Sequence, residues 1–72
     1  MEFLVSYDRV ADSLYLRLKA GRVADSVEVS EGVILDLDEE GSILGVEILN
    51  YSKSGVDVDR LIVEGVEAVV KV

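Results

Sequence analysis

The chain has 72 residues, of which 50% are apolar, and carries a formal net charge of −8 at pH 7. With only 7 Lys and Arg residues, it lacks the basic surplus with which proteins bind nucleic acids or anionic membranes. It contains no Cys and no His, which excludes disulfides, thiolate metal sites and the commonest general base. We therefore expect a single domain over residues 1–72 that is not an enzyme and needs no cofactor.

The size of the chain favours association with a second copy. A domain this short buries only about 60% of its unfolded surface, and without Cys it cannot add a disulfide. Its apolar residues are mostly Val, Leu and Ile, which suit sheets, and those left exposed in a patch would mark an interface. We expect a homodimer or higher oligomer. No apolar run approaches the ~20 residues of a membrane span and no signal peptide is visible, so we expect a cytoplasmic protein.

Short strands and tight turns are predicted for the first 30 residues. Residues 2–7 are mostly apolar and predict a strand, and the side chain of Asp8 can organise the turn that follows. Leucines at alternate positions from Leu14 to Leu18 predict a strand with one apolar face. A turn at Gly21 precedes a further strand over residues 23–29.

The clearest element is a hairpin over residues 33–49. Two runs rich in β-branched residues flank an acidic loop in which Gly41 supplies the positive φ of a tight turn. Alternation along the first run predicts two faces, one formed by Val33, Leu35 and Leu37 and the other by Asp36 and Asp38.

The last third of the chain combines a polar connection with a short helix. Residues 50–55 are polar, and Asp57 is placed to cap a helix from Asp57 to Glu64 that ends at Gly65. A last strand is predicted over residues 66–72. The fold class is α+β and mostly β, an antiparallel meander of about five strands with a short C-terminal helix.

The hairpin loop also matches a calcium-binding pattern. Over residues 36–47, acidic residues, a central Gly and a final Glu fall at the ligand spacing of an EF-hand loop. An EF-hand loop lies between helices, whereas these flanks predict strands, so a solvated hairpin tip explains the residues better. The alternative is a weak divalent-cation site formed by Asp36, Asp38, Glu40 and Glu47.

Two stretches of the sequence resemble the DUF2283 family of small prokaryotic proteins. They are Tyr7-Asp8-x-x-Ala11-Asp12-x-Leu14-Tyr15-Leu16-x-Leu18 and Gly32-Val33-Ile34-Leu35-Asp36-x-Asp38-x-x-Gly41-x-Ile43-x-Gly45-x-Glu47-Ile48-Leu49-Asn50, followed by Ser52-Lys53. The resemblance runs from Phe3 to about Lys53, and the tail from Gly55 onward matches no family feature. The family is one of unknown function, so the resemblance implies no catalytic residues. Some of its members look like genomic neighbours of small toxin-like proteins, which would suit an acidic antitoxin or regulatory partner.

The sequence therefore favours a non-enzymatic, homo-oligomeric protein-interaction module whose apolar sheet face or edge binds itself or a partner. One alternative is an antitoxin-like regulatory protein that binds a small basic protein through charge complementarity. The other is a weak divalent-cation-binding domain that uses the acidic hairpin.

Overall fold

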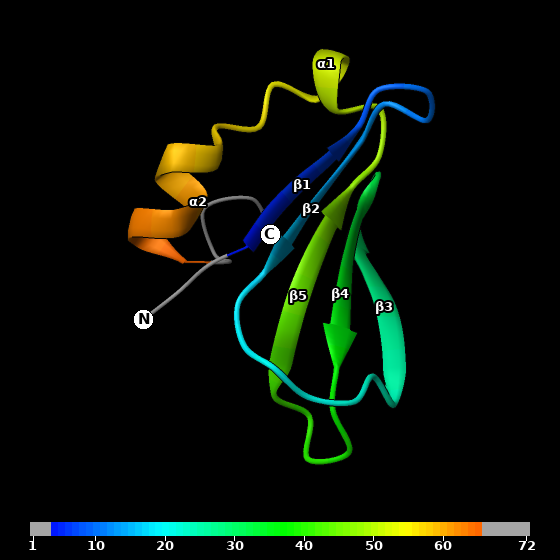
Figure 1. Cartoon of the computed structure of the whole chain (residues 1–72), viewed down its shortest axis with the longest axis vertical. Coiled ribbons are helices and arrows are strands. Elements are labelled where there is room, and N and C mark those ends of the chain that lie inside the picture. The colour runs from blue at the N-terminus through cyan, green and yellow to red at the C-terminus, as the bar shows by residue number, and fades with distance from the viewer. Residues whose placement is uncertain (1–3, 66–72) are drawn as a thin grey trace.

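Five strands precede two short helices in the computed structural model, which describes residues 4–65 (Figure 1). The predicted α+β, mostly β fold with antiparallel strands is confirmed. The predicted last strand over residues 66–72 lies outside the described residues. The elements are β1 (Leu4–Asp8), β2 (Ser13–Arg17), β3 (Asp25–Ser30), β4 (Val33–Leu37), β5 (Ile43–Ile48), α1 (Tyr51–Ser54) and α2 (Val58–Glu64).

The strands form one antiparallel sheet in the order β1-β2-β5-β4-β3. Strands β3, β4 and β5 are a meander, and the β1–β2 hairpin joins it beside β5 through a long connection from β2 to β3. Three hairpin-linked strands, with a fourth strand (β2) that is joined to one end of the meander by a connection and lies beside the strand at its other end (β5), make a Greek key. The register sets Leu14 opposite Ile48 and Leu16 opposite Val46, so apolar residues of β2 and β5 share one face.

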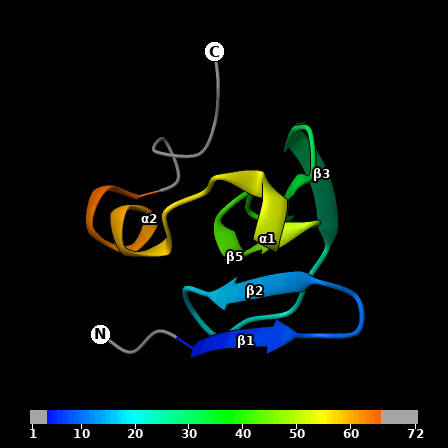
Figure 2. The ribbon, with the colours of Figure 1, turned by 90° about the horizontal axis from the view of Figure 1, so that it is seen from above.

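The core lies between this apolar face and α2. Figure 2 shows the helices on one side of the strongly twisted sheet. Leu61 of α2 is 2% exposed and packs against the sheet. Each side chain of this kind contributes about 1.5–3 kcal/mol when fully buried. The sheet residues of the cluster are Leu14, Leu16, Val33, Leu35, Val46 and Ile48.

Side-chain caps define the turn after β1 and the start of α2, as predicted. Oδ1 of Asp8 accepts hydrogen bonds from the N–H groups two and three residues on, at 2.9 and 3.2 Å. Asp57 accepts from the N–H of Arg60 at 3.2 Å, and α2 ends where the N–H of Gly65 donates to Leu61. These carboxylates satisfy N–H groups that the turn and helix leave without partners.

The start of the connection from β2 to β3 is hydrogen-bonded to β5 at a point where the pairing of β5 with β4 is irregular. The register of β4 with β5 shifts between Asp36 and Leu37, and the fully buried Leu44 lies at this shift. Its carbonyl oxygen accepts from the N–H of Leu18 at 2.8 Å. A Cβ at Gly21 would lie 2.7 Å from the Leu44 side chain. A side chain at Gly21 would therefore require the buried Leu44 side chain to shift, and the φ of 157° at this position is one that residues other than glycine rarely adopt.

A short helix occupies the predicted polar connection. Residues 50–55 contain α1, which follows Asn50 in the left-handed conformation (φ 51°). A single turn of four residues is too short to produce the 3.6-residue periodicity from which a helix is recognised. Across residues 4–65, no helix is long and apolar enough to cross a membrane.

Candidate functional site

The acidic hairpin tip is closed by Asp38. Its Oδ1 accepts from the N–H groups of Glu40 and Ser42, each at 2.9 Å, and its Oδ2 lies 3.7 Å from Nζ of Lys19. The hydrogen bond from Ser42 is the main cause that lowers the pKa of Asp38. Asp38 thus stabilises the loop in its charged form. Glu40 is exposed at the tip.

The other two residues of the predicted cation site lie on the strands. Asp36 of β4 accepts hydrogen bonds from side chains of β2 and β3, and Glu47 lies further along β5, opposite Tyr15. Within residues 4–65, no three acidic side chains are grouped so that they could hold a metal ion. The structure therefore does not bring Asp36, Asp38, Glu40 and Glu47 together, and a weak cation site stays a prediction.

A row of polar side chains crosses the face of the sheet opposite α2. The hydroxyl of Tyr15 on β2 donates a hydrogen bond to Oδ2 of Asp36 at 3.0 Å, and the hydroxyl of Ser26 on β3 donates one to Oδ1 at 2.7 Å. The phenol ring passes over β5 at Gly45, where a Cβ would lie 2.6 Å from Cζ of the ring. Burial, followed by the bond to Asp36, raises the pKa of Tyr15. The row therefore ties β2, β4 and β3 together.

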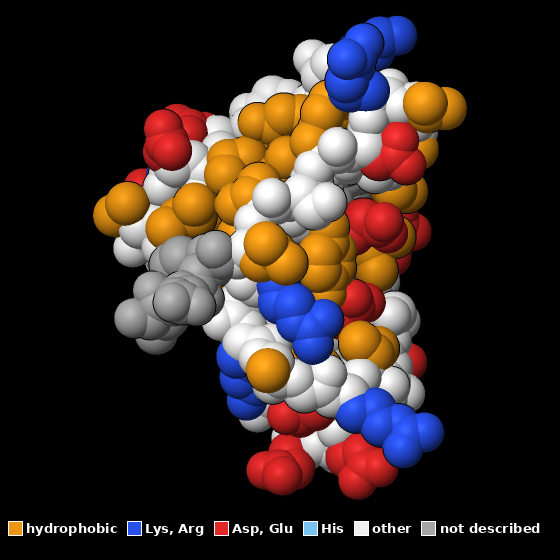
Figure 3. Space-filling model, viewed as in Figure 1, with side chains coloured by type: hydrophobic (Ala, Val, Ile, Leu, Met, Phe, Trp, Pro, Cys, Tyr) orange, Lys and Arg blue, Asp and Glu red, His pale blue; other side chains and the backbone are white. Residues whose placement is uncertain are grey.

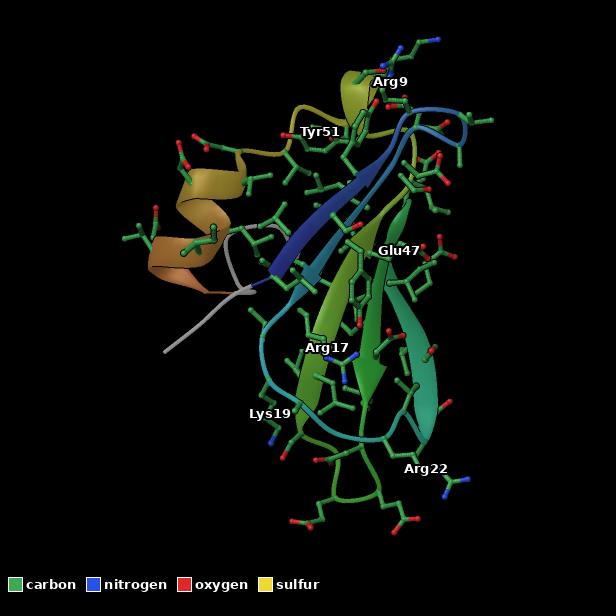
Figure 4. The ribbon with its side chains drawn as sticks, viewed as in Figure 1. Arg9, Arg17, Lys19, Arg22, Glu47 and Tyr51 are labelled. Atoms are coloured by element: carbon green, nitrogen blue, oxygen red, sulfur yellow. The ribbon has the colours of Figure 1, made fainter. Side chains whose placement is uncertain are left out.

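Arg17 and Glu47 share this face with the tyrosine (Figure 4). Nη2 of Arg17 donates to the carbonyl oxygen of Gly21 at 3.0 Å, which holds the connection from β2 to β3 against the sheet. Tyr15, Asp36 and Ser26 are thus bonded to one another and Arg17 to the backbone, as expected of residues that stabilise a sheet.

A second network, the Asp12 corner, joins the β1–β2 turn to α1. Oδ1 of Asp12 accepts from the Tyr7 hydroxyl at 2.6 Å and from the N–H of Ser52 at 3.1 Å. Its Oδ2 accepts from Oγ of Ser52 at 2.7 Å, and its carbonyl accepts from the N–H of Tyr51. The Tyr51 ring meets the Tyr7 ring edge-on, with centroids 5.9 Å apart.

Charge and protonation in the corner follow from these bonds. The Tyr7 hydroxyl, and then Ser52, lower the pKa of Asp12, while the same bond to Asp12 raises the pKa of Tyr7. At neutral pH the carboxylate is therefore ionised and the phenol protonated. The corner fixes the side chain of Tyr7 on the edge strand β1.

The two edges of the sheet differ in their chemistry. All five residues of β1 are exposed, and its apolar side chains are 63% (Leu4), 46% (Val5) and 45% (Tyr7) accessible. On β3, Val27 is 39% accessible, and the strand also carries Asp25 and Glu28. Figure 3 shows apolar side chains gathered over the part of the surface that β1 crosses, and acidic side chains at the hairpin tip. Among residues 4–65, neither edge is paired with a further strand.

A shallow cavity of about 400 Å³ lies between the β3–β4 turn and the segment around α1. Apolar side chains of Val33, Leu49 and Val56 line it together with the oppositely charged Glu31 and Lys53. It is separate from the Asp12 corner and from the polar row.

The topology defines a small α+β protein in which a Greek-key sheet is covered on one face by helix α2. The chain belongs to the DUF2283 family, whose model, described as a protein of unknown function, matches residues 4–52. No curated protein and no solved structure matches the chain. The matched region contains the five strands and the whole Asp12 corner, but not α2.

Sequence reasoning did not identify the contacts of two residue pairs. Asp12 and Ser52 are 40 residues apart, and Tyr15 and Gly45 lie on strands that only the sheet order makes neighbours. The four residues all belong to the stretches that resemble the family. That resemblance was the available signal, although it does not indicate which members of the motif touch.

Proposed function

We propose that this protein is a non-enzymatic interaction module that associates with itself through an edge of its sheet. The observation that carries the proposal is the exposed, apolar edge strand β1. Its backbone is unpaired on the outer side among the described residues, and its side chains are about half accessible. An unprotected edge of this kind is a template for pairing with another strand.

The net negative charge of the protein favours β1 as the edge at which two copies meet. A net charge of −8 causes copies of the chain to repel one another at long range. Residues 4–7 carry no charged side chain, no proline and no lysine, which are the usual means of blocking an edge. Association through β1 thus places the least charge at the contact.

The oligomeric state of the full chain tests the proposal. Light scattering after size exclusion, and sedimentation over a dilution series, should give a mass of at least twice 7.8 kDa at micromolar concentration. Added salt should strengthen association, because it screens the repulsion between acidic copies. A mass of one chain at every concentration and salt would contradict the proposal.

A further inference from the structure

We infer that the second copy of the chain docks on β1 itself, antiparallel, about a two-fold axis that passes beside Ser6. This inference rests on the proposed self-association through β1 and adds the orientation and the register of the second copy. In this register Val5 of each copy lies opposite Tyr7 of the other, and the two sheets become one continuous sheet.

The other edge of the sheet is a poorer surface for a second copy. β3 carries Asp25 and Glu28, so a pair of β3 strands would bring four carboxylates into one short contact. Its register is also interrupted between Glu28 and Ser30, and such irregularities twist an edge away from straight pairing. β1 pairs with β2 without interruption over residues 4–8.

The position of Asp8 determines the register. With the axis beside Ser6, each Asp8 lies opposite Leu4 of the second copy. The two carboxylates are then four residues apart along the strands, about 14 Å, which exceeds the roughly 8 Å Debye length at physiological salt. An axis beside Tyr7 would leave the two Asp8 residues only about 7 Å apart and Leu4 without a partner.

Tyr7 is already held in place for this contact. Its hydroxyl is bonded to Asp12 at 2.6 Å and its ring lies against Tyr51, yet 45% of the side chain is accessible. A side chain that is fixed before binding loses little conformational freedom on binding. Aromatic side chains of this kind are typical anchors of interfaces, and an aromatic residue opposite Val5 is a favourable cross-strand pair.

A cysteine beside the axis gives a direct test, because the chain contains no Cys of its own. A two-fold axis beside Ser6 places the two Cα atoms about 4.5–5.5 Å apart, within the roughly 4.4–6.8 Å that a disulfide spans. Under mild oxidation, Ser6→Cys should form a covalent dimer far faster than the control Ser26→Cys, which replaces an exposed serine of the other edge. Equal cross-linking of the two variants would overturn the inference.

A charge on the edge gives a second, matched test. Val5→Lys should convert the oligomer to a monomer, whereas Val27→Lys should not change its mass. The two valines are 46% and 39% accessible, and both lie on the face that carries the core. Circular dichroism checks that both variants keep the fold. A Val5→Lys protein that stays oligomeric would overturn the β1 interface and leave self-association standing, whereas a monomeric wild-type chain would overturn both.

Discussion

Two turns of this protein are each organised by one aspartate, Asp12 between β1 and β2 and Asp38 between β4 and β5. Each carboxylate accepts backbone hydrogen bonds, and each has a lowered pKa. The distance along the chain differs. The backbone partners of the Asp38 side chain lie two and four residues on, whereas Ser52 lies 40 residues from Asp12.

Asp38 therefore closes one loop, whereas Asp12 joins parts of the fold that are distant in the sequence. Without its carboxylate, Asp38 would leave a loosened loop at the end of a hairpin whose strands still pair. Asp12 connects the β1–β2 turn to α1 and also holds Tyr7, so its loss affects three segments together. We therefore expect the two turns to respond differently to similar substitutions.

Asp12→Ala should cause the largest loss of stability. It removes the acceptor for Tyr7 and Ser52, and it places alanine at a left-handed φ of 53°. Thermal unfolding at fixed protein concentration should show a midpoint several degrees below wild type. Asparagine tolerates this φ and keeps an oxygen acceptor, so the midpoint of Asp12→Asn should lie between those of wild type and Asp12→Ala. An unchanged midpoint for Asp12→Ala would contradict the joining role of this residue.

Gly45→Ala tests a contact between strands that involves no charge. The new Cβ would displace the Tyr15 ring from β5 and break its bond to Asp36, at a cost of about 1–3 kcal/mol. In a Tyr15→Ala background the same change should cost much less, because the only close contact left to the new Cβ is the carbonyl oxygen of Leu16, at 3.1 Å. Urea unfolding of the four proteins measures the coupling. A cost that is the same in both backgrounds would show that the ring is not the cause.

Asp38→Ala should cost less than Asp12→Ala, since its lost bonds lie within one exposed loop. Thermal unfolding of both variants at the same concentration gives the comparison directly. Glu39→Ala, at an exposed position of the same loop, serves as the control and should resemble wild type. If Asp38→Ala proved the more destabilising variant, the distinction between the two turns would be wrong.

The smallest expected effect is the dependence of stability on pH. A lowered pKa means that Asp12 and Asp38 stabilise the fold above their unfolded pKa of about 3.9, and that this stability is lost as pH falls through the folded values. The raised pKa of Tyr7 means that its contribution is present below about pH 10 and is lost as pH rises through the folded value. Unfolding midpoints measured across pH should therefore fall at both ends.

Two variants assign these pH effects to the two turns. Asp38→Asn should flatten only the acid side of the profile, whereas Tyr7→Phe should also flatten the alkaline side. Tyr15→Phe is the control on the alkaline side, because the pKa of Tyr15 is raised too. An alkaline decline that is the same in wild type and Tyr7→Phe would place its origin outside the Asp12 corner.

Features that depend on neighbouring residues could be predicted from the sequence. The turn at Asp8, the cap at Asp57 and the positive φ of Gly41 (83°) each follow from the geometry of a few adjacent residues. Alternation likewise predicted β2 and β4, because the side-chain period of two is a local property.

Features that depend on the choice of a distant partner could not be predicted. The leucine face of β2 is as compatible with the valines of β3 as with Val46 and Ile48, and only the folded sheet selects β5. Once β5 lies beside β2, Tyr15 can cross Gly45 and Asp12 can reach Ser52. The contacts of Tyr15 and of Asp12 thus follow from the order of the strands, which a single sequence indicates only weakly.

The strand order also has a consequence for how the chain folds as it is synthesised. β5 is the last strand of the sheet in the chain, yet it lies at the centre between β2 and β4. Until β5 emerges, the β1–β2 hairpin has no neighbour in the sheet, and an isolated hairpin is marginally stable in water. We expect hydrogen exchange during refolding to protect β4 and β5 first and β1 last, because pairing of β2 with β5 requires closure of a long loop.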